Sequence, residues 1–285
     1  MSAVDDARPL LIVNADDFAL TERVSQGIID AHRRGIVTST SVLTLTPAFD
    51  RSVAMLRDVD SIGIGVHFAA VGEDPPLLSA REIPSLVDGD GRLWNSWKVF
   101  LPRAAAGRID PDDLRREFAA QIEAVTAAGL TVDHFDTHQN LHMWPMVHDV
   151  VVELGESHGV RRVRMTRSRQ WGPVGLTVRA LARRSERRLS ARGWTWPADY
   201  TGLDEAGAFG AGEMVQALGR LAASGASTTE LASHPGLPDD PARDRYRWGY
   251  QWASEYEALC SGSVRAIVDE LGFRLGTYAD LPVPA

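Results

Sequence analysis

The feature that most restricts the fold is an alternation of short apolar runs with helical segments. Leu10–Phe18 begins with four apolar residues, two of them β-branched, and Ile62–His67 is a second apolar run. Between them, Thr21 can cap a helix over 22–34, and another helix is expected over 49–57. Strands that are apolar throughout are buried on both faces, and their alternation with helices is typical of right-handed βαβ units. The pattern therefore predicts an α/β fold with a parallel sheet.

The alternation of apolar runs and helical segments continues toward the C-terminus with one interruption. Residues 68–107 are irregular and rich in proline and glycine, and a loop of this length in a compact domain is typically functional. We expect one domain over 1–285, built on a single TIM-like (β/α) barrel that is irregular or has fewer than eight strands, with a lid-like insertion around 68–107. Further strands are expected over 36–45, 131–136, 160–166, 229–233 and 273–278, and further helices over 111–128, 145–157, 175–192, 213–224, 250–259 and 264–271.

The charge distribution indicates which classes of partner the protein can bind. The formal net charge is −8, whereas nucleic-acid-binding proteins have a basic surface, so we expect no nucleic acid as partner. One stretch departs from this balance, because residues 161–192 hold eleven arginines and a single acid, Glu186. We interpret it as a solvated helix face, with an anionic substrate, a partner or a membrane surface as alternatives.

Other features bear on location. Cys260 is the only cysteine, which excludes an internal disulfide and a cysteine-based zinc cluster. No apolar run approaches the length of a membrane span, and the N-terminus lacks the layout of a signal peptide. We therefore expect a cytoplasmic protein without a membrane span. The sequence is compatible with a homodimer.

Side chains that can bind a metal ion or move protons follow four of the expected strands. They are Asp16 with Asp17, His67, His138 with His142, and His234. The carboxyl ends of barrel strands meet at one mouth, so these side chains should converge. One carboxylate and two imidazoles form a known catalytic metal arrangement, in which the ion acidifies a water and polarises a carbonyl. For Asp16 and Asp17 taken alone, a solvated turn with a helix cap is an equal alternative.

Several of these positions lie in short motifs: Asn14–Phe18, Gly27–Ile29, Gly35–Thr40, Gly65–His67, Asp136–His142, Ser233–Gly236 and Arg274–Tyr278. These motifs resemble those of the YdjC-like carbohydrate deacetylases, a family that includes chitooligosaccharide and hopanoid-biosynthesis deacetylases. The match spans nearly the whole chain in the family's order. Two positions depart from it: Ala19 stands where many members have glycine, and Asn140 where many have a further histidine.

The resemblance implies a mechanism. It implies that Asp17, His67 and His138 hold one divalent metal ion. It also implies that Asp16 is the general base and that His234 protonates the leaving amine or stabilises the oxyanion. Two imidazoles and a carboxylate suit Zn²⁺, whereas Mg²⁺ normally prefers oxygen ligands, and the resemblance allows both ions. The reaction of the family is hydrolysis of an N-acetyl group from an amino sugar, with release of acetate.

Three further residues are expected around this centre. Asp136, His142 and Asn140 could orient a metal-bound imidazole or face the substrate. A strand-end cap is an equal alternative for Asp136, and direct metal binding is a less favoured one for His142. Aromatic platforms for a sugar ring are also expected, although most tryptophans should lie in the core. The tryptophans considered are Trp94, Trp97, Trp144, Trp171, Trp194 and Trp196.

The sequence therefore favours a metal-dependent hydrolase that deacetylates an N-acetylated sugar, oligosaccharide or glycolipid headgroup. Two alternatives remain. One is a non-catalytic carbohydrate-binding or regulatory protein on the same fold, which the intact set of metal ligands argues against. The other is another metal-assisted hydrolase that acts on a phosphoester or a cyclic amide, and the Arg-rich stretch could hold a phosphate group.

Overall fold

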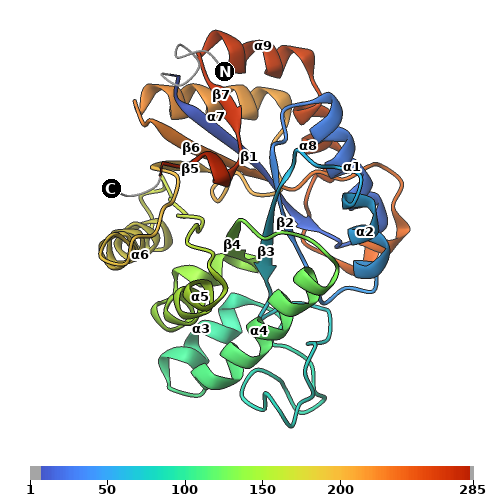
Figure 1. Cartoon of the computed structure of the whole chain (residues 1–285), viewed down its shortest axis with the longest axis vertical. Coiled ribbons are helices and arrows are strands. Elements are labelled where there is room, and N and C mark those ends of the chain that lie inside the picture. Colours follow the sequence, from blue (N-terminus) through green and yellow to red (C-terminus); the bar gives the residue numbers. More distant parts are fainter. Residues whose placement is uncertain (1–7, 283–285) are drawn as a thin grey trace.

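The strands form one curled parallel sheet with helices around it (Figure 1). The computed structural model describes residues 8–282. The strand order is β4-β3-β2-β1-β6-β5, and β7 pairs with β1 beside this path. The expectation of an irregular barrel with fewer than eight strands is confirmed. The strands are β1 (Leu10–Phe18), β2 (Ser39–Val42), β3 (Gly63–Phe68), β4 (His134–Thr137), β5 (Asp199–Thr201), β6 (Thr228–Ser233) and β7 (Arg274–Gly276).

The helices cover the outer side of the curled sheet. In Figure 1, α1, α2 and α8 lie to the right of the strands, and α5 and α6 lie to the left. The expected cap of α1 is present, because the Thr21 side chain accepts a hydrogen bond from the backbone N–H of Val24. The helices are α1 (Glu22–Arg34), α2 (Phe49–Leu56), α3 (Trp97–Ala105), α4 (Pro111–Ala127), α5 (Pro145–His158), α6 (Pro173–Ser190), α7 (Ala211–Ala223), α8 (Trp252–Leu259) and α9 (Gly262–Glu270).

Strand β1 is the central element of the sheet. All nine of its residues are buried, and it pairs with β2, β6 and β7. Its register sets Ala15 beside Ser233 of β6, so the residues that follow on both strands emerge at the same edge. Likewise, β3 and β4 are in a register that pairs His67 with Asp136. The strand pairing therefore brings the expected site residues together.

The segment expected as a strand over 160–166 is only partly paired, and that expectation of a regular strand is wrong. It forms isolated pairings of Val163 with Phe135 and of Arg162 with Thr195. Phe135 belongs to β4, whereas Thr195 precedes β5, a short strand that the sequence pattern did not predict. Beyond β4 the sheet is therefore extended by single bridges instead of by a continuous ladder.

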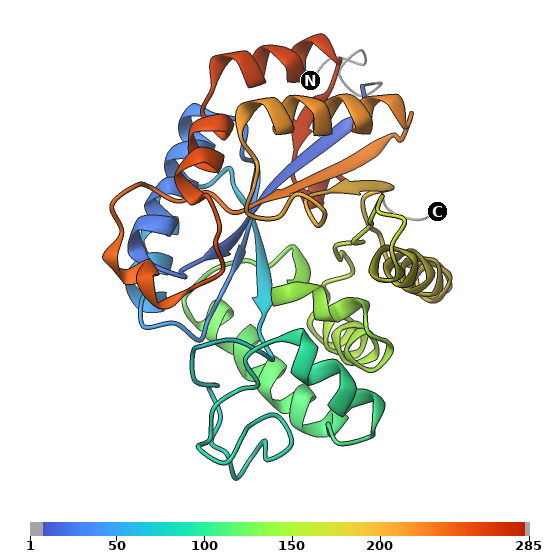
Figure 2. The ribbon, with the colours of Figure 1, turned by 180° about the vertical axis from the view of Figure 1, so that it is seen from behind.

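The insertion over 68–107 is irregular up to Ser96 and then forms helix α3, which the sequence pattern did not predict and which contains Pro102. The insertion is anchored, since Ile83, Leu86 and Phe100 are fully buried. Its role as a lid stays a prediction. The ribbon seen from behind shows that α3 and the insertion lie beside α4 (Figure 2).

Among the helices within residues 8–282, none combines the length and apolarity that crossing a bilayer requires.

Candidate metal centre

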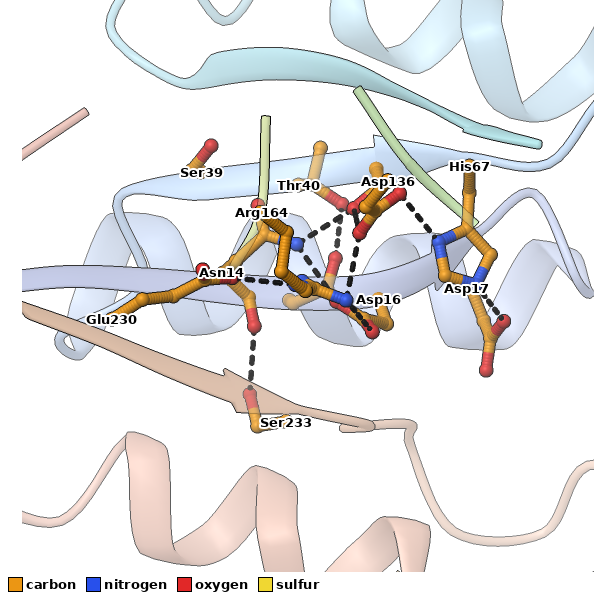
Figure 3. Close-up of polar contacts among 12 residues, drawn as sticks. Asn14, Asp16, Asp17, Ser39, Thr40, His67, Asp136, Arg164, Glu230 and Ser233 are labelled. Atoms are coloured by element: carbon orange, nitrogen blue, oxygen red, sulfur yellow. Dashed lines mark hydrogen bonds and ion pairs between the residues drawn. The ribbon is translucent and has the colours of Figure 1, made fainter. Parts of the chain in front are cut away.

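Asp17, His67 and His138 direct one ligand atom each toward a common point. They lie at the end of β1, on β3, and at the start of the short turn η2 (His138–Met143) that follows β4. Their ligand atoms all lie within 4.8 Å of one another, and all three residues are buried. The Oδ1 atom of Asp17 is 3.4 Å from Nε2 of His67 and 3.4 Å from Nδ1 of His138. We call these three residues the Asp-His-His trio; Figure 3 shows Asp17 and His67 facing each other.

The trio fits a divalent metal ion. Asp17 Oδ1 is buried and has no hydrogen-bond partner among the described residues. A separation of 3.4 Å is long for an N–H···O hydrogen bond. However, it matches the distance of about 3.4 Å between ligands that each lie about 2.1 Å from a tetrahedral ion. Burial acts to raise the pKa of Asp17, but the His138 and His67 rings outweigh it and lower that pKa to about 2.

A backbone irregularity separates Asp16 from Asp17. The register between β1 and β2 shifts between Ala15 and Phe18, as in a β-bulge, and Asp17 has a φ of 64°. Ala19 also has a positive φ, 73°, a conformation that favours glycine. The chain thus departs from the family's glycine at a position whose backbone suits glycine better. The bulge turns the two neighbouring carboxylates toward different partners.

Asp16 is held by a buried arginine. Its two carboxylate oxygens accept hydrogen bonds from Nη1 and Nη2 of Arg164, each at 2.6 Å, and Oδ1 also accepts one from the Asn14 amide at 2.7 Å. The Nε2 atom of His234 lies 3.8 Å from Asp16 Oδ2. A bidentate guanidinium fixes the orientation of a carboxylate. Asp16 therefore has a fixed position between Arg164 and His234 (Figure 3 for Asp16 and Arg164).

Arg164 binds three carboxylates at once. Besides Asp16, its Nη1 lies 2.7 Å from Asp136 Oδ2, and its Nε donates to Glu230 Oε1 at 2.8 Å. The side chain is fully buried, so the three negative charges compensate its own burial. Sequence reasoning missed this residue, because it counted Arg164 among the arginines of a solvated face. The sequence has no signal that distinguishes Arg164 from the arginines around it, because its carboxylate partners are distant in the chain.

Asp136 orients His67. The Nδ1–H of His67 donates to Asp136 Oδ1 at 2.7 Å, which leaves Nε2 directed toward Asp17. Burial lowers the pKa of His67, but the Asp136 carboxylate outweighs it and raises that pKa to about 9. Burial also acts to raise the pKa of Asp136, and Arg164 and His67 instead hold it well below its usual range. Metal-bound histidines commonly donate their second N–H to a carboxylate in this way.

His142 and Asn140 lie beside the centre but outside the trio. Gln139 and Asn140 both have a φ of 55°, so the turn η2 is kinked and His138 and His142 do not share a helical face. His142 is buried, its Nδ1 lies 2.9 Å from Thr137 Oγ1, and burial lowers its pKa to about 3. Asn140 Oδ1 accepts a hydrogen bond from Thr166 at 2.6 Å. Both residues therefore support the turn that carries His138.

Two aromatic rings that sequence reasoning missed lie against the imidazoles. The ring of Trp248 is centred 5.0 Å from that of His138, and the ring of Tyr250 is 4.8 Å from that of His234. Burial, together with the charge of Asp17, raises the pKa of Tyr250. The signal in the sequence was an alternation with period two, because aromatic residues occupy positions 246, 248, 250 and 252.

The carboxylate of Glu255 contacts the backbone of His234. The His234 backbone N–H donates to Glu255 Oε2 at 2.6 Å. The His234 Nδ1 and Glu255 Oε1 atoms are both buried and have no hydrogen-bond partner among the described residues. Burial raises the pKa of Glu255, while the neighbouring His234 acts to lower it. His234 thus has two acidic neighbours, Asp16 near its imidazole and Glu255 at its backbone N–H.

An apolar groove of about 420 Å³ lies beside the turn η2, and none of the trio residues lines it. The turn η2 forms its inner wall, while α3 and α6 supply most of the remaining residues. Of the six tryptophans considered from the sequence, Trp97 and Trp144 line this groove, whereas Trp194 is buried and Trp171 is exposed.

Sequence comparisons find similar proteins over most of the chain. The profile of a family described as "YdjC-like protein" matches residues 10–270. A chitooligosaccharide deacetylase of Serratia marcescens is 30% identical over 279 residues, which are 95% of this chain and 99% of that protein. A carbohydrate deacetylase of Brevibacillus brevis is 33% identical over 150 residues, which are 53% of this chain and 57% of that protein.

Solved structures share the fold. A crystal structure from Enterococcus faecalis V583, described as a candidate for cellobiose-phosphate cleavage, has a TM-score of 0.79 and 26% identity. The structural match covers 95% of this chain and 98% of the Enterococcus faecalis chain. A mutant of a CE4 family pseudoenzyme with restored enzymatic activity has a TM-score of 0.50 at 11% identity, and it covers 96% of this chain and 67% of that one. The second likeness bears on the fold alone.

Proposed function

Because this chain belongs to the YdjC-like family, we propose that it is a metal-dependent hydrolase that removes the N-acetyl group from an amino sugar, an oligosaccharide or a glycolipid headgroup. The observation that supports this most strongly is the Asp-His-His trio, whose ligand atoms lie within 4.8 Å of one another beside Asp16 and His234. The relatives from Serratia marcescens and Brevibacillus brevis are named as deacetylases, which agrees with this proposal.

In the proposed enzyme, Asp17, His67 and His138 hold one divalent ion, and Asp136 keeps His67 in the tautomer that leaves Nε2 free. Such an ion would polarise the amide carbonyl and lower the pKa of a water molecule bound to it. Two nitrogen ligands and one oxygen ligand favour Zn²⁺ over Mg²⁺.

Asp16 is the proposed general base. Its oxygens bind Arg164, yet a carboxylate has about four acceptor sites, so it can also accept a proton from the attacking water. The water oxygen bonds to the acyl carbon, the C–N bond breaks, and His234 gives a proton to the departing nitrogen. The products are acetate and the free amine of the sugar.

Trp248 and Tyr250 are the proposed contacts for the sugar ring. Both side chains are only partly buried and lie against the imidazoles of His138 and His234. An aromatic face offers apolar contact to the C–H groups of a pyranose.

The phosphoester alternative has little support in this geometry. Arg164 reaches the centre, but three carboxylates already bind its guanidinium, so it is not free to clamp a phosphate. The binding-protein alternative is disfavoured because the trio is complete.

Acetate release tests the proposal. The panel contains N-acetylglucosamine, its short oligomers and an N-acetylglucosaminyl lipid, each with chelator, without it, and after re-addition of Zn²⁺ or Mg²⁺. We expect acetate from at least one substrate, loss of release with chelator, and recovery with metal. Sugar binding without chelator-sensitive release of acetate from any substrate would contradict the proposal and favour the binding protein.

A further inference from the structure

Helix α6 carries a surface that the proposed reaction does not use. In Figure 1 this helix lies at the edge of the molecule beside α5, seen along its axis. Leu176, Arg183 and Arg187 are spaced by seven and four residues, so they form one exposed stripe, and Arg184 is exposed next to it. Trp171, just before the helix, is 87% exposed. We call these five residues the α6 face.

The arginines of the α6 face are not neutralised. Within residues 8–282, Arg183, Arg184 and Arg187 have no ion-pair partner, and the nearby Glu186 binds Arg167 instead. The whole chain has a net charge of −8. Positive charge is therefore concentrated on one side of an acidic protein, where it can orient the molecule toward an anionic surface.

The apolar residues around this charge are also exposed. Besides Trp171, Leu176 is 51% exposed, and Val174 is 59% exposed at the rim of the apolar groove between α6 and α3. Exposed indole and aliphatic groups beside arginines are the composition of helices that lie in the headgroup region of a bilayer. The interpretation of α6 as a solvated helix face explains the exposed arginines, but it does not explain the exposed tryptophan and leucine.

We propose that the α6 face binds the surface of an anionic lipid bilayer. A second copy of this chain fits the same face poorly. A two-fold interface would set the arginines of one copy against those of the other, and like charges at short range repel. A bilayer instead offers anionic headgroups to Arg183, Arg184 and Arg187 and an apolar interior to Trp171. This inference does not depend on the proposed deacetylation.

Vesicle co-sedimentation of the full chain tests the inference. The vesicles are phosphatidylglycerol mixed with phosphatidylcholine, or phosphatidylcholine alone, at low and high salt. We expect binding to the anionic vesicles only, weakened by salt. The triple variant Arg183→Gln, Arg184→Gln, Arg187→Gln should bind roughly 100-fold more weakly, about fivefold per arginine. Trp171→Ser should weaken binding at both salt concentrations.

A matched control carries the same charge change elsewhere: Arg33→Gln, Arg57→Gln, Arg81→Gln, at three exposed arginines outside α6. It should bind like the wild type. Equal losses of binding in the two triple variants would show that net charge alone drives binding, which would overturn the proposal. Failure of the wild type to bind anionic vesicles would also overturn it. A wild-type dimer that dissociates in the α6 variant, without vesicle binding, would assign the face to a second copy instead. Unchanged thermal unfolding of both variants serves as the folding check.

Discussion

At the scale of single residues, the neighbouring carboxylates Asp16 and Asp17 have opposite surroundings. Asp16 binds the guanidinium of Arg164 through both oxygens, whereas Asp17 Oδ1 has no hydrogen-bond partner within the described chain. A buried carboxylate oxygen without a partner is costly, and a metal ion would remove that cost. A second ion position formed by Asp16, His67 and Asp136 is less suitable, because Arg164 already supplies positive charge there. The surroundings thus support Asp17 as ligand and Asp16 as base.

The first prediction concerns Asp16. The Asp16→Asn variant should retain stoichiometric metal but release acetate at least ~100-fold more slowly, because it lacks the proposed base. The matched control is Asp244→Asn, which changes an exposed carboxylate and should leave the rate unchanged. Metal content by elemental analysis and steady-state acetate release are the measurements. A rate like that of the wild type would remove Asp16 from the mechanism.

The second prediction concerns His67. The His67→Ala variant should lose the metal itself, since it removes one of three proposed ligands and leaves Asp17 with a single imidazole. His158→Ala, at an exposed histidine, should keep the metal. Elemental analysis after gel filtration distinguishes the two. A full equivalent of metal in His67→Ala would refute the assignment of His67.

The residues of the centre differ in how far the sequence could reveal them. That Asp16, Asp17, His67, His138 and His234 lie close together was predictable, because each lies at or after the end of an apolar run that leads to the mouth of the sheet. Arg164 was not, since its partners are distant in the chain and a charged residue is normally exposed. The positive φ of Asp17 and the kink at Asn140 are likewise set by tertiary contacts and leave no periodic signal.

At the scale of elements, the segment next to β4 is held by a few contacts. The segment that carries Arg164 pairs with Phe135 on one side and with Thr195 on the other. Trp194, next to Thr195, is buried against Gly155 of α5, where a Cβ atom would lie 2.3 Å from the indole and 2.5 Å from the Val160 carbonyl oxygen. This close approach therefore requires glycine in the helix.

The third prediction follows from that contact. Gly155→Ala should lower the free energy of unfolding by about 1–3 kcal/mol, because the added methyl group overpacks the contact. Gly219→Ala in α7 is the matched control. Its Cβ would meet nothing within 4 Å, so the change should raise stability by about 0.5–1 kcal/mol. Denaturant unfolding of both variants gives the comparison. Equal effects would show that helix propensity, and not packing, decides at Gly155.

Element prediction failed where the periodic signal was short or interrupted. Strand β5 has three residues, too few for an alternation, and α3 contains Pro102, which normally marks the end of a helix. Longer elements with caps, such as α1 with Thr21 and α4 with Asp110, were predictable from the sequence. The stretch 160–166 has three β-branched residues, Val160, Val163 and Thr166, which favour a strand, but it forms only single bridges with its neighbours.

At the scale of the whole molecule, the proposed metal joins strands that are far apart in the sequence. Asp17 ends β1, His67 lies on β3, and His138 follows β4. The unfolded chain does not hold these ligands together, so metal binding should favour the folded state. The stability of the whole chain thereby becomes a readout of the centre that requires no substrate.

The fourth prediction is metal-dependent stability. At a free metal concentration of 100 Kd, the ion should add about 2.7 kcal/mol to the free energy of unfolding. For a chain of 285 residues, that corresponds to a rise in Tm of roughly 4–5 °C. Chelator should reverse the rise, and Zn²⁺ should act at lower concentration than Mg²⁺, because two of the three ligands are nitrogen atoms. Thermal unfolding followed by circular dichroism measures the shift.

The Asp17→Asn variant decides whether that shift comes from the trio. It keeps the size of the side chain and removes the charge that both imidazoles face, so Tm should no longer respond to metal over the same range. His158→Ala, which leaves the trio intact, should respond like the wild type. If Asp17→Asn showed the full rise in Tm, the ion would bind elsewhere on the chain. In that case neither the ligand assignment nor the mechanism that depends on it would stand.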